Sequence, residues 1–126
     1  VYHLGRVSFD DLMSLYSLAD LFVMPNIPVE GDQEGFGLVA LEASVRGTWV
    51  VASGIEGITE AVIDGANGTL LPPEEPDRWI AKIRELLSMP QQELAEWGRR
   101  GQSYTTDHFS WERMVDGYKT VFDRFI

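Results

Sequence analysis

The segment EGFGLVALE, residues 34–42, combines two glycines with an apolar run and carries a glutamate at each end. From about Gly37 to Arg46 the residues are apolar nearly all round, which is typical of a buried helix, and Gly47 predicts where that helix ends. An unpaired carboxylate is costly inside such a helix. We therefore expect the Glu42 side chain either to face a cleft or to have a buried partner.

Predicted strands and helices alternate on both sides of this segment. The apolar runs LFVMP (21–25) and TWVVAS (48–53) are typical of strands that are covered on both faces. VYHLG (1–5) and TLLP (69–72) predict two further short strands, and Ser8 with Asp11 forms a capping-box pattern that opens a helix between the first two. The sequence therefore predicts an α/β fold, with a parallel sheet and helices on both of its faces.

Three helices are expected after the last strand. Pro76 and Pro90 suit the first turn of a helix, and Phe109, Ser110 and Met114 fit a hydrophobic staple around an N-cap serine. The final helix carries an apolar stripe formed by Trp111, Met114, Val115, Tyr118, Val121, Phe122 and Phe125.

Composition limits the classes of partner. The 126 residues fit one domain, and 20 acidic against 10 basic residues give a net charge of −10, which opposes binding to nucleic acid. A phosphate site must therefore be built from local dipoles or from basic residues elsewhere. The chain has no cysteine, which excludes disulfide and thiolate chemistry. No apolar run approaches the roughly 18 residues of a membrane span.

The two glutamates admit several interpretations. Glu34 also suits the dipole of a helix start. The two carboxylates of a glycosidase lie about 5–10 Å apart. On one straight helix, Glu34 and Glu42 would be too far apart, because eight residues rise about 12 Å. If Glu34 lies in a loop, the sequence does not fix the distance between the two. The spacing better suits two acceptors of hydroxyl hydrogen bonds at opposite ends of an elongated ligand. Between them, Gly35 and Gly37 allow close backbone approach, and amides at a helix start bind phosphate.

At this point the sequence resembles a known family. EGFGLVALEA followed by GTWVVAS is similar to the E-x7-E region of retaining, GT-B-fold glycosyltransferases of the glycosyltransferase 4 (group 1) family. HLGRVS, LFVMPN, GIEGITEAVIDGANGTLLPPEEPDRW and HFSWERMVDGY match the family in the same order, over nearly the whole chain. The resemblance implies a Rossmann-like sheet, the second half of a GT-B C-terminal domain. Residues 1–126 would then be a partial sugar-nucleotide-binding domain, without the N-terminal acceptor domain and the first two strands of this domain.

The resemblance also implies residue roles. Glu34 would be the catalytic-centre carboxylate that contacts the donor sugar, and Glu42 would hold the ribose. The other implied donor-binding residues are Gly35, Phe36, Gly37, Leu38 and Val39, through their amides, and Gly5, Arg6 and Val7, near the base. The donor would be a nucleotide-diphosphate sugar, with no metal and no other cofactor. Three departures from the family pattern are Trp49 in place of proline, Ser44 with Val45 in place of alanine-methionine, and Glu56 in place of glycine.

These roles lead to expectations for the whole protein. We expect a transferase that moves a sugar with retention of anomeric configuration, and an isolated chain that is inactive. The missing domain, another segment or a second copy would complete the sheet. We expect a cytoplasmic location, with peripheral contact at the cytoplasmic membrane face through the absent domain as an alternative. A sugar-nucleotide epimerase, a phosphorylase and a non-catalytic interaction module are the alternative functions; the E-x7-E pair favours the transferase over the first two.

Overall fold

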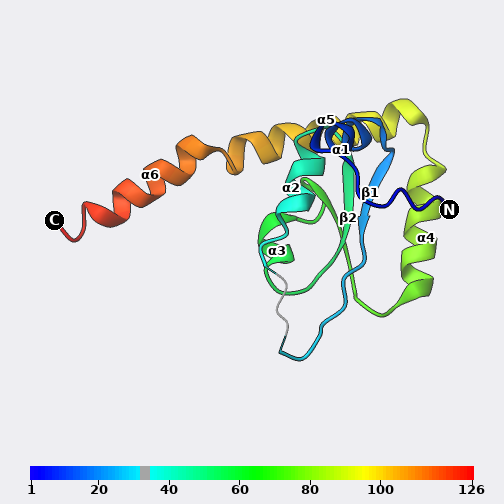
Figure 1. Ribbon diagram of the computed structural model, residues 1–126, viewed down its shortest axis with the longest axis horizontal. Helices are drawn as coiled ribbons and strands as arrows, with labels where there is room; N and C mark the ends of the chain where they lie inside the picture. Colours follow the sequence, from blue (N-terminus) through cyan, green and yellow to red (C-terminus); the bar gives the residue numbers. More distant parts are fainter. Residues whose placement is uncertain (32–34) are drawn as a thin grey trace.

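The computed structural model describes residues 1–31 and 35–126, and Figure 1 shows how helices and strands alternate along them. In chain order the elements are α1 (Phe9–Leu18), β1 (Leu21–Met24), α2 (Leu38–Ser44), β2 (Trp49–Ser53), α3 (Ile58–Ala61), β3 (Gly68–Leu71), α4 (Pro76–Leu87), α5 (Gln91–His108) and α6 (Trp111–Phe122).

The three strands form one parallel sheet in the order β1-β2-β3. Leu21 lies opposite Trp49, and Val50 lies opposite Gly68. All five residues of β2 are buried, as the continuous apolar run predicted for a strand covered on both faces. Among the described strands β1 pairs only with β2, so its other edge has no strand beside it.

Alternate residues of β2 point to two separate cores. Val50 and Ala52 join a core with α1, α2 and α3, whereas Trp49 and Val51 join a core with α4 and α5. The first core contains Tyr16, Met24, Ala40, Ala43, Ile55, Ile58 and Val62, and the second contains Leu71, Trp79, Leu86 and Leu94. The Rossmann-like parallel sheet with helices on both faces is therefore confirmed.

The predicted strand over residues 1–5 is wrong. This segment has no strand structure, and residues 1–6 are all exposed. A strand requires a neighbour that takes up its backbone hydrogen bonds, and none of the described strands lies beside this segment.

The helix ends follow the local signals. The Ser8 hydroxyl accepts a hydrogen bond from the Asp11 amide at the start of α1, and Ser110 caps α6 in the same way by accepting from the Arg113 amide. Pro76 is the first residue of α4. Helix α2 is shorter than predicted, but it ends before Gly47, whose φ of 86° is the left-handed conformation expected beyond a helix.

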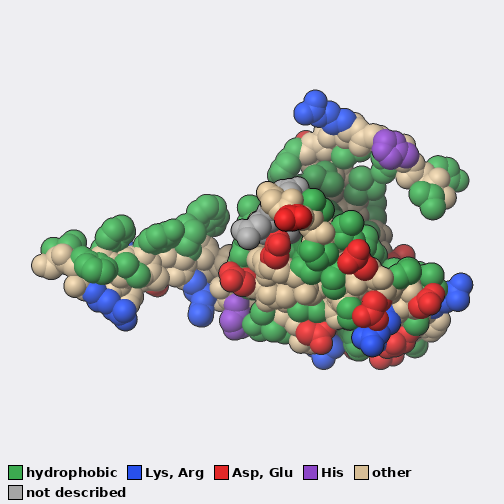
Figure 2. Space-filling model, turned by 90° about the horizontal axis from the view of Figure 1, so that it is seen from below, with side chains coloured by type: hydrophobic (Ala, Val, Ile, Leu, Met, Phe, Trp, Pro, Cys, Tyr) green, Lys and Arg blue, Asp and Glu red, His purple; other side chains and the backbone are tan. Residues whose placement is uncertain are grey.

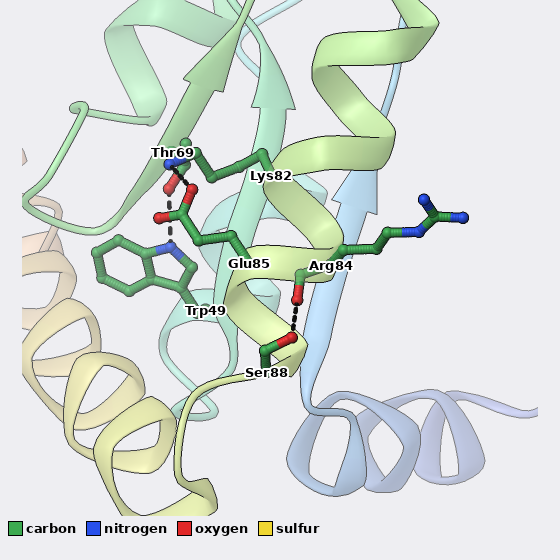
Figure 3. A network of polar contacts seen from close by, with 6 residues as sticks. All are labelled: Trp49, Thr69, Lys82, Arg84, Glu85 and Ser88. Carbon is green, nitrogen blue, oxygen red and sulfur yellow. Dashed lines mark hydrogen bonds and ion pairs between the residues drawn. The ribbon is translucent and has the colours of Figure 1, made fainter.

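On the α4 side of the sheet, Trp49 has a specific role (Figure 3). Its indole nitrogen donates a hydrogen bond of 3.0 Å to the Thr69 hydroxyl on β3, and its ring meets that of Trp97 edge-on at 5.1 Å between centroids. The side chain is 2% exposed. The residue that replaces the family's proline thus joins two strands and α5.

Helix α6 leaves the body of the domain as a projecting arm (Figure 1). None of its residues is buried. The apolar stripe that the sequence places on this helix is exposed, with Trp111 at 77% and Phe122 at 59%, and Figure 2 shows hydrophobic side chains gathered along the arm. The stripe exists as predicted, but no described residue of this chain covers it.

Candidate functional site

The candidate site lies where the chain passes from β1 to α2. Glu34, the predicted catalytic residue, lies outside the described residues. Gly35, Phe36 and Gly37 lead directly into α2, which begins at Leu38. In open α/β sheets, ligands bind beyond the carboxyl ends of the strands, and β1 supplies such an end here.

The loop before α3 supports residues 35–37 closely. A Cβ atom added to Gly57 would lie 2.3 Å from the Gly35 carbonyl oxygen and 3.2 Å from the Phe36 Cα, so only glycine fits there. Gly37 caps α2 with a φ of 73° and packs on Ile58, the first residue of α3. Residues 35–37 are therefore packed closely against the loop before α3, and this contact depends on Gly57, which the sequence did not single out.

Glu42 lies on the exposed side of α2. Helix α2 buries Ala40, Ala43 and Ser44, whereas Glu42 is exposed. Leu38 and Val39 are also exposed, at 63% and 42%. An apolar helix therefore turns one side to the core and leaves the other open around a carboxylate. The Glu42 carboxylate is therefore accessible to a ligand, and the buried partner that its apolar surroundings suggested is Tyr16.

The partner of Glu42 belongs to another element. Tyr16, on α1, is 6% exposed, and its ring meets that of Phe22 edge-on at 5.5 Å between centroids. Burial, followed by the charge of the Glu42 carboxylate and a hydrogen bond to it, raises the pKa of the Tyr16 hydroxyl. Tyr16 thus helps to orient Glu42 from the core side, a contact between distant residues that no spacing in the sequence could indicate.

An apolar groove opens beside the start of α2. It has a volume of about 500 Å³ and lies between Phe36, Leu38 and Leu41 on one side and the α5–α6 corner on the other. The rings of Phe36 and Phe109 are 5.9 Å apart between centroids. Basic groups line it as well, from His108 and Arg113. The start of α2 and the residue Phe36 before it are therefore in contact with the junction from which α6 projects.

The predicted base-binding residues precede α1. Gly5 and Arg6 are exposed and Val7 is half-buried, in the segment before α1. Among the described residues, no hydrogen bond, ion pair or ring contact joins them to residues 35–42. The structure thus brings Gly35, Phe36, Gly37, Leu38, Val39 and Glu42 together on one short segment.

A buried polar cluster behind α2 was missed by sequence reasoning. Ser44, Asn67 and Thr105 are each 1% exposed and are joined by hydrogen bonds. Two signals were present. Ser44 is a hydroxyl residue in an apolar helix, and Gly98 and Gly101 are costly inside a helix unless close packing requires them.

Comparison with known proteins shows the family of this chain. Residues 1–104 match the family model described as "Glycosyl transferases group 1". The D-inositol 3-phosphate glycosyltransferase of Segniliparus rotundus is 41% identical over 106 residues, which make up 84% of this chain and 22% of that protein. The chain thus spans about a fifth of this relative's length.

Solved structures share the fold. Sucrose-phosphate synthase from Thermosynechococcus elongatus superposes with a TM-score of 0.78 at 30% identity, over 96% of this chain and 30% of that one. Anabaena Alr3699/HepE, solved in complex with UDP-glucose, gives a TM-score of 0.76 at 25% identity, over 96% and 31%. In the described residues no helix has the length and apolarity to cross a membrane. The chain belongs to the group 1 glycosyltransferase family, because residues 1–104 match the family model and the fold is shared with a glycosyltransferase structure.

Proposed function

We propose that this chain is the donor-binding part of a glycosyltransferase that transfers a sugar from a nucleotide-diphosphate sugar to an acceptor, with retention of anomeric configuration. The observation that carries the proposal is the E-x7-E segment itself. In a chain of the group 1 family, its second glutamate stands accessible on α2. The complex of the related HepE structure with UDP-glucose supports the choice of ligand class.

In this proposal the residues act as follows. The backbone amides from Gly35 to Val39 hold the diphosphate, because amides at a helix start point toward an anion without needing a metal or a lysine. Glu42 accepts hydrogen bonds from the ribose hydroxyls, and Glu34 contacts the donor sugar. Gly5, Arg6 and Val7 lie beside the nucleobase of the donor.

The acidity of the chain limits how the diphosphate can be held. With a net charge of −10, the chain as a whole repels an anionic donor at long range. The amides must therefore act at short range, together with basic residues outside this chain. The two relatives are roughly three to four times as long as this chain. We propose that the remainder supplies the acceptor site and completes the sheet beside β1, and that the isolated chain is inactive without it. Turnover by the isolated 126 residues would contradict that dependence.

The test is a calorimetric titration of the full-length protein with uridine, guanosine and adenosine diphosphates and their sugars. One nucleotide class should bind in a one-to-one complex. Glu42→Gln should weaken it by at least about tenfold, because a hydrogen bond to a charged group contributes about 1.5–3 kcal/mol. Glu93→Gln, a change of the same chemistry on an exposed position of α5, is the matched control and should bind as the wild type does.

Product analysis tests the reaction. The anomeric configuration of the transferred sugar, read by nuclear magnetic resonance, should equal that of the donor. An inverted product would contradict retention. In the titration, equal affinity of the wild type and Glu42→Gln for the nucleotide would contradict the proposed donor site.

A further inference from the structure

A buried polar cluster lies at the C-terminal end of α2. The Ser44 and Thr105 hydroxyl oxygens are 2.8 Å apart, and the Asn67 side-chain amide donates to the Thr105 hydroxyl at 3.1 Å. All three side chains are 1% exposed, so water cannot readily replace these partners. The Thr105 hydroxyl therefore links α5 to α2 and to the turn before β3.

Asn67 joins this cluster to the backbone. Its side-chain amide also donates to the Ala61 carbonyl oxygen at 2.9 Å, and its carbonyl oxygen accepts from the Ile63 amide at 2.7 Å. Ala61 is the last residue of α3, and Ile63 lies between α3 and β3. Thr105 is thus held relative to the sheet and not only to its own helix.

Helix α5 makes two further close contacts behind α2. The Gln102 side chain donates to the Val45 carbonyl oxygen at 2.7 Å. A Cβ atom on Gly98 would lie only 1.9 Å from the Gly47 carbonyl oxygen, so the two backbones nearly touch. The C-terminal end of α2 is therefore held by α5, whereas Leu38 and Val39 at its other end remain exposed.

We infer that Thr105 is a positioning residue for the donor site, acting through Ser44 on the orientation of Glu42. Glu42 and Ser44 are two residues apart on a helix of seven residues, so any rotation or shift of α2 moves both together. A misplacement of about 1 Å can lower the rate of a catalysed reaction by up to ~100-fold, and hydrogen bonds to a ligand weaken when their distances and angles change. The inference rests on the proposed function, because it assumes that Glu42 holds the donor.

The test uses Thr105→Val, which keeps the shape but removes the hydroxyl, and Thr105→Ser, which keeps the hydroxyl. Both are made in the full-length protein, together with Glu42→Gln and the double variant Thr105→Val/Glu42→Gln. The dissociation constant of the nucleoside diphosphate selected by the wild type is measured by calorimetry. Thr105→Val should bind about tenfold more weakly, a change of ~1.4 kcal/mol, and Thr105→Ser should restore affinity to within about twofold.

The double variant separates positioning from general stability. If Thr105 acts through Glu42, its substitution should cost less than about twofold once Glu42 is already changed, because coupled residues are not additive. A tenfold loss that persists in that background would overturn the inference, as would wild-type affinity in Thr105→Val. If Thr105→Val fails to fold, Ser44→Ala replaces it in the same cycle.

The wild-type and Glu42→Gln proteins test the underlying function separately. If the wild type binds no nucleoside diphosphate, or if Glu42→Gln binds as the wild type does, the proposed donor site is wrong and the inference falls with it. If Glu42→Gln weakens binding while Thr105→Val does not, the donor site stands and only the positioning role is refuted.

Discussion

Replacing Gly98 by alanine should destabilise the domain although alanine favours helices. In an unconstrained helix interior the change would stabilise by about 1 kcal/mol. Here the new Cβ would lie 1.9 Å from the Gly47 carbonyl oxygen, and contacts below 3.0 Å are essentially never found, so α5 must retreat by at least about 1 Å. That retreat would stretch the 2.8 Å contact between Ser44 and Thr105 and the 2.7 Å bond from Gln102 beyond hydrogen-bonding distance.

The expected magnitude follows from these losses. Two hydrogen bonds contribute about 1 kcal/mol each, and buried groups left without partners add about 1–3 kcal/mol. After the gain of about 1 kcal/mol in helix propensity is subtracted, the net loss should be about 2–4 kcal/mol, which overlaps the range of about 1–3 kcal/mol observed for overpacked interiors.

Urea unfolding of the 126-residue chain, followed by circular dichroism, measures this loss. A destabilisation of 2 kcal/mol should lower the unfolding midpoint by about 1 M, with an unchanged slope. Gly117→Ala is the matched control, because Gly117 lies inside α6 with nothing within 4 Å of the added Cβ. It should increase helicity and leave the midpoint unchanged. An unaltered or raised midpoint for Gly98→Ala would refute the close backbone contact between α5 and the end of α2.

Three further predictions concern other parts of the chain. The pKa of Tyr16 is raised above its ordinary value of 10.0, so the folded state loses stability as the pH rises above 10 through the raised folded-state pKa. Between about pH 9 and about pH 11, Tyr16→Phe should therefore lose less free energy of unfolding in urea than the wild type does. An equal loss would contradict the raised pKa of Tyr16. Backbone amides of α6, which has no buried residue, should exchange with solvent far faster than those of α5 in hydrogen-exchange measurements, and equal protection would show that α6 is covered. The Ser53 hydroxyl is fully buried and has no hydrogen-bond partner among the described residues, so Ser53→Ala should raise the free energy of unfolding by about 1 kcal/mol; a clear destabilisation would indicate an unseen partner.

Local signals predicted most of the fold. Continuous apolar runs identified β1 and β2, and the hydroxyls of Ser8 and Ser110 marked helix starts that the structure confirms. These features depend on residues adjacent in the chain, which is why sequence alone was sufficient. The segment of residues 1–5 was misassigned because a strand depends on a distant neighbour, and the composition of the segment does not reveal whether that neighbour is present.

The side of a helix that faces the core is harder to predict when the helix is apolar all round. Periodicity could not tell which side of α2 is buried, so the exposure of Glu42 came only from the structure. The same holds for α6, where an apolar stripe normally indicates a buried face, but no described residue covers it. The cluster of Ser44, Asn67 and Thr105 joins residues up to 61 positions apart, beyond the reach of any local pattern.

The most direct test of the proposed donor site is a crystal structure of the full-length protein with its nucleoside diphosphate bound. We expect the diphosphate oxygens within hydrogen-bonding distance of the amides at the start of α2, and a ribose hydroxyl donating to the Glu42 carboxylate. A nucleotide bound elsewhere, with Glu42 contacting only Tyr16, would contradict the proposal.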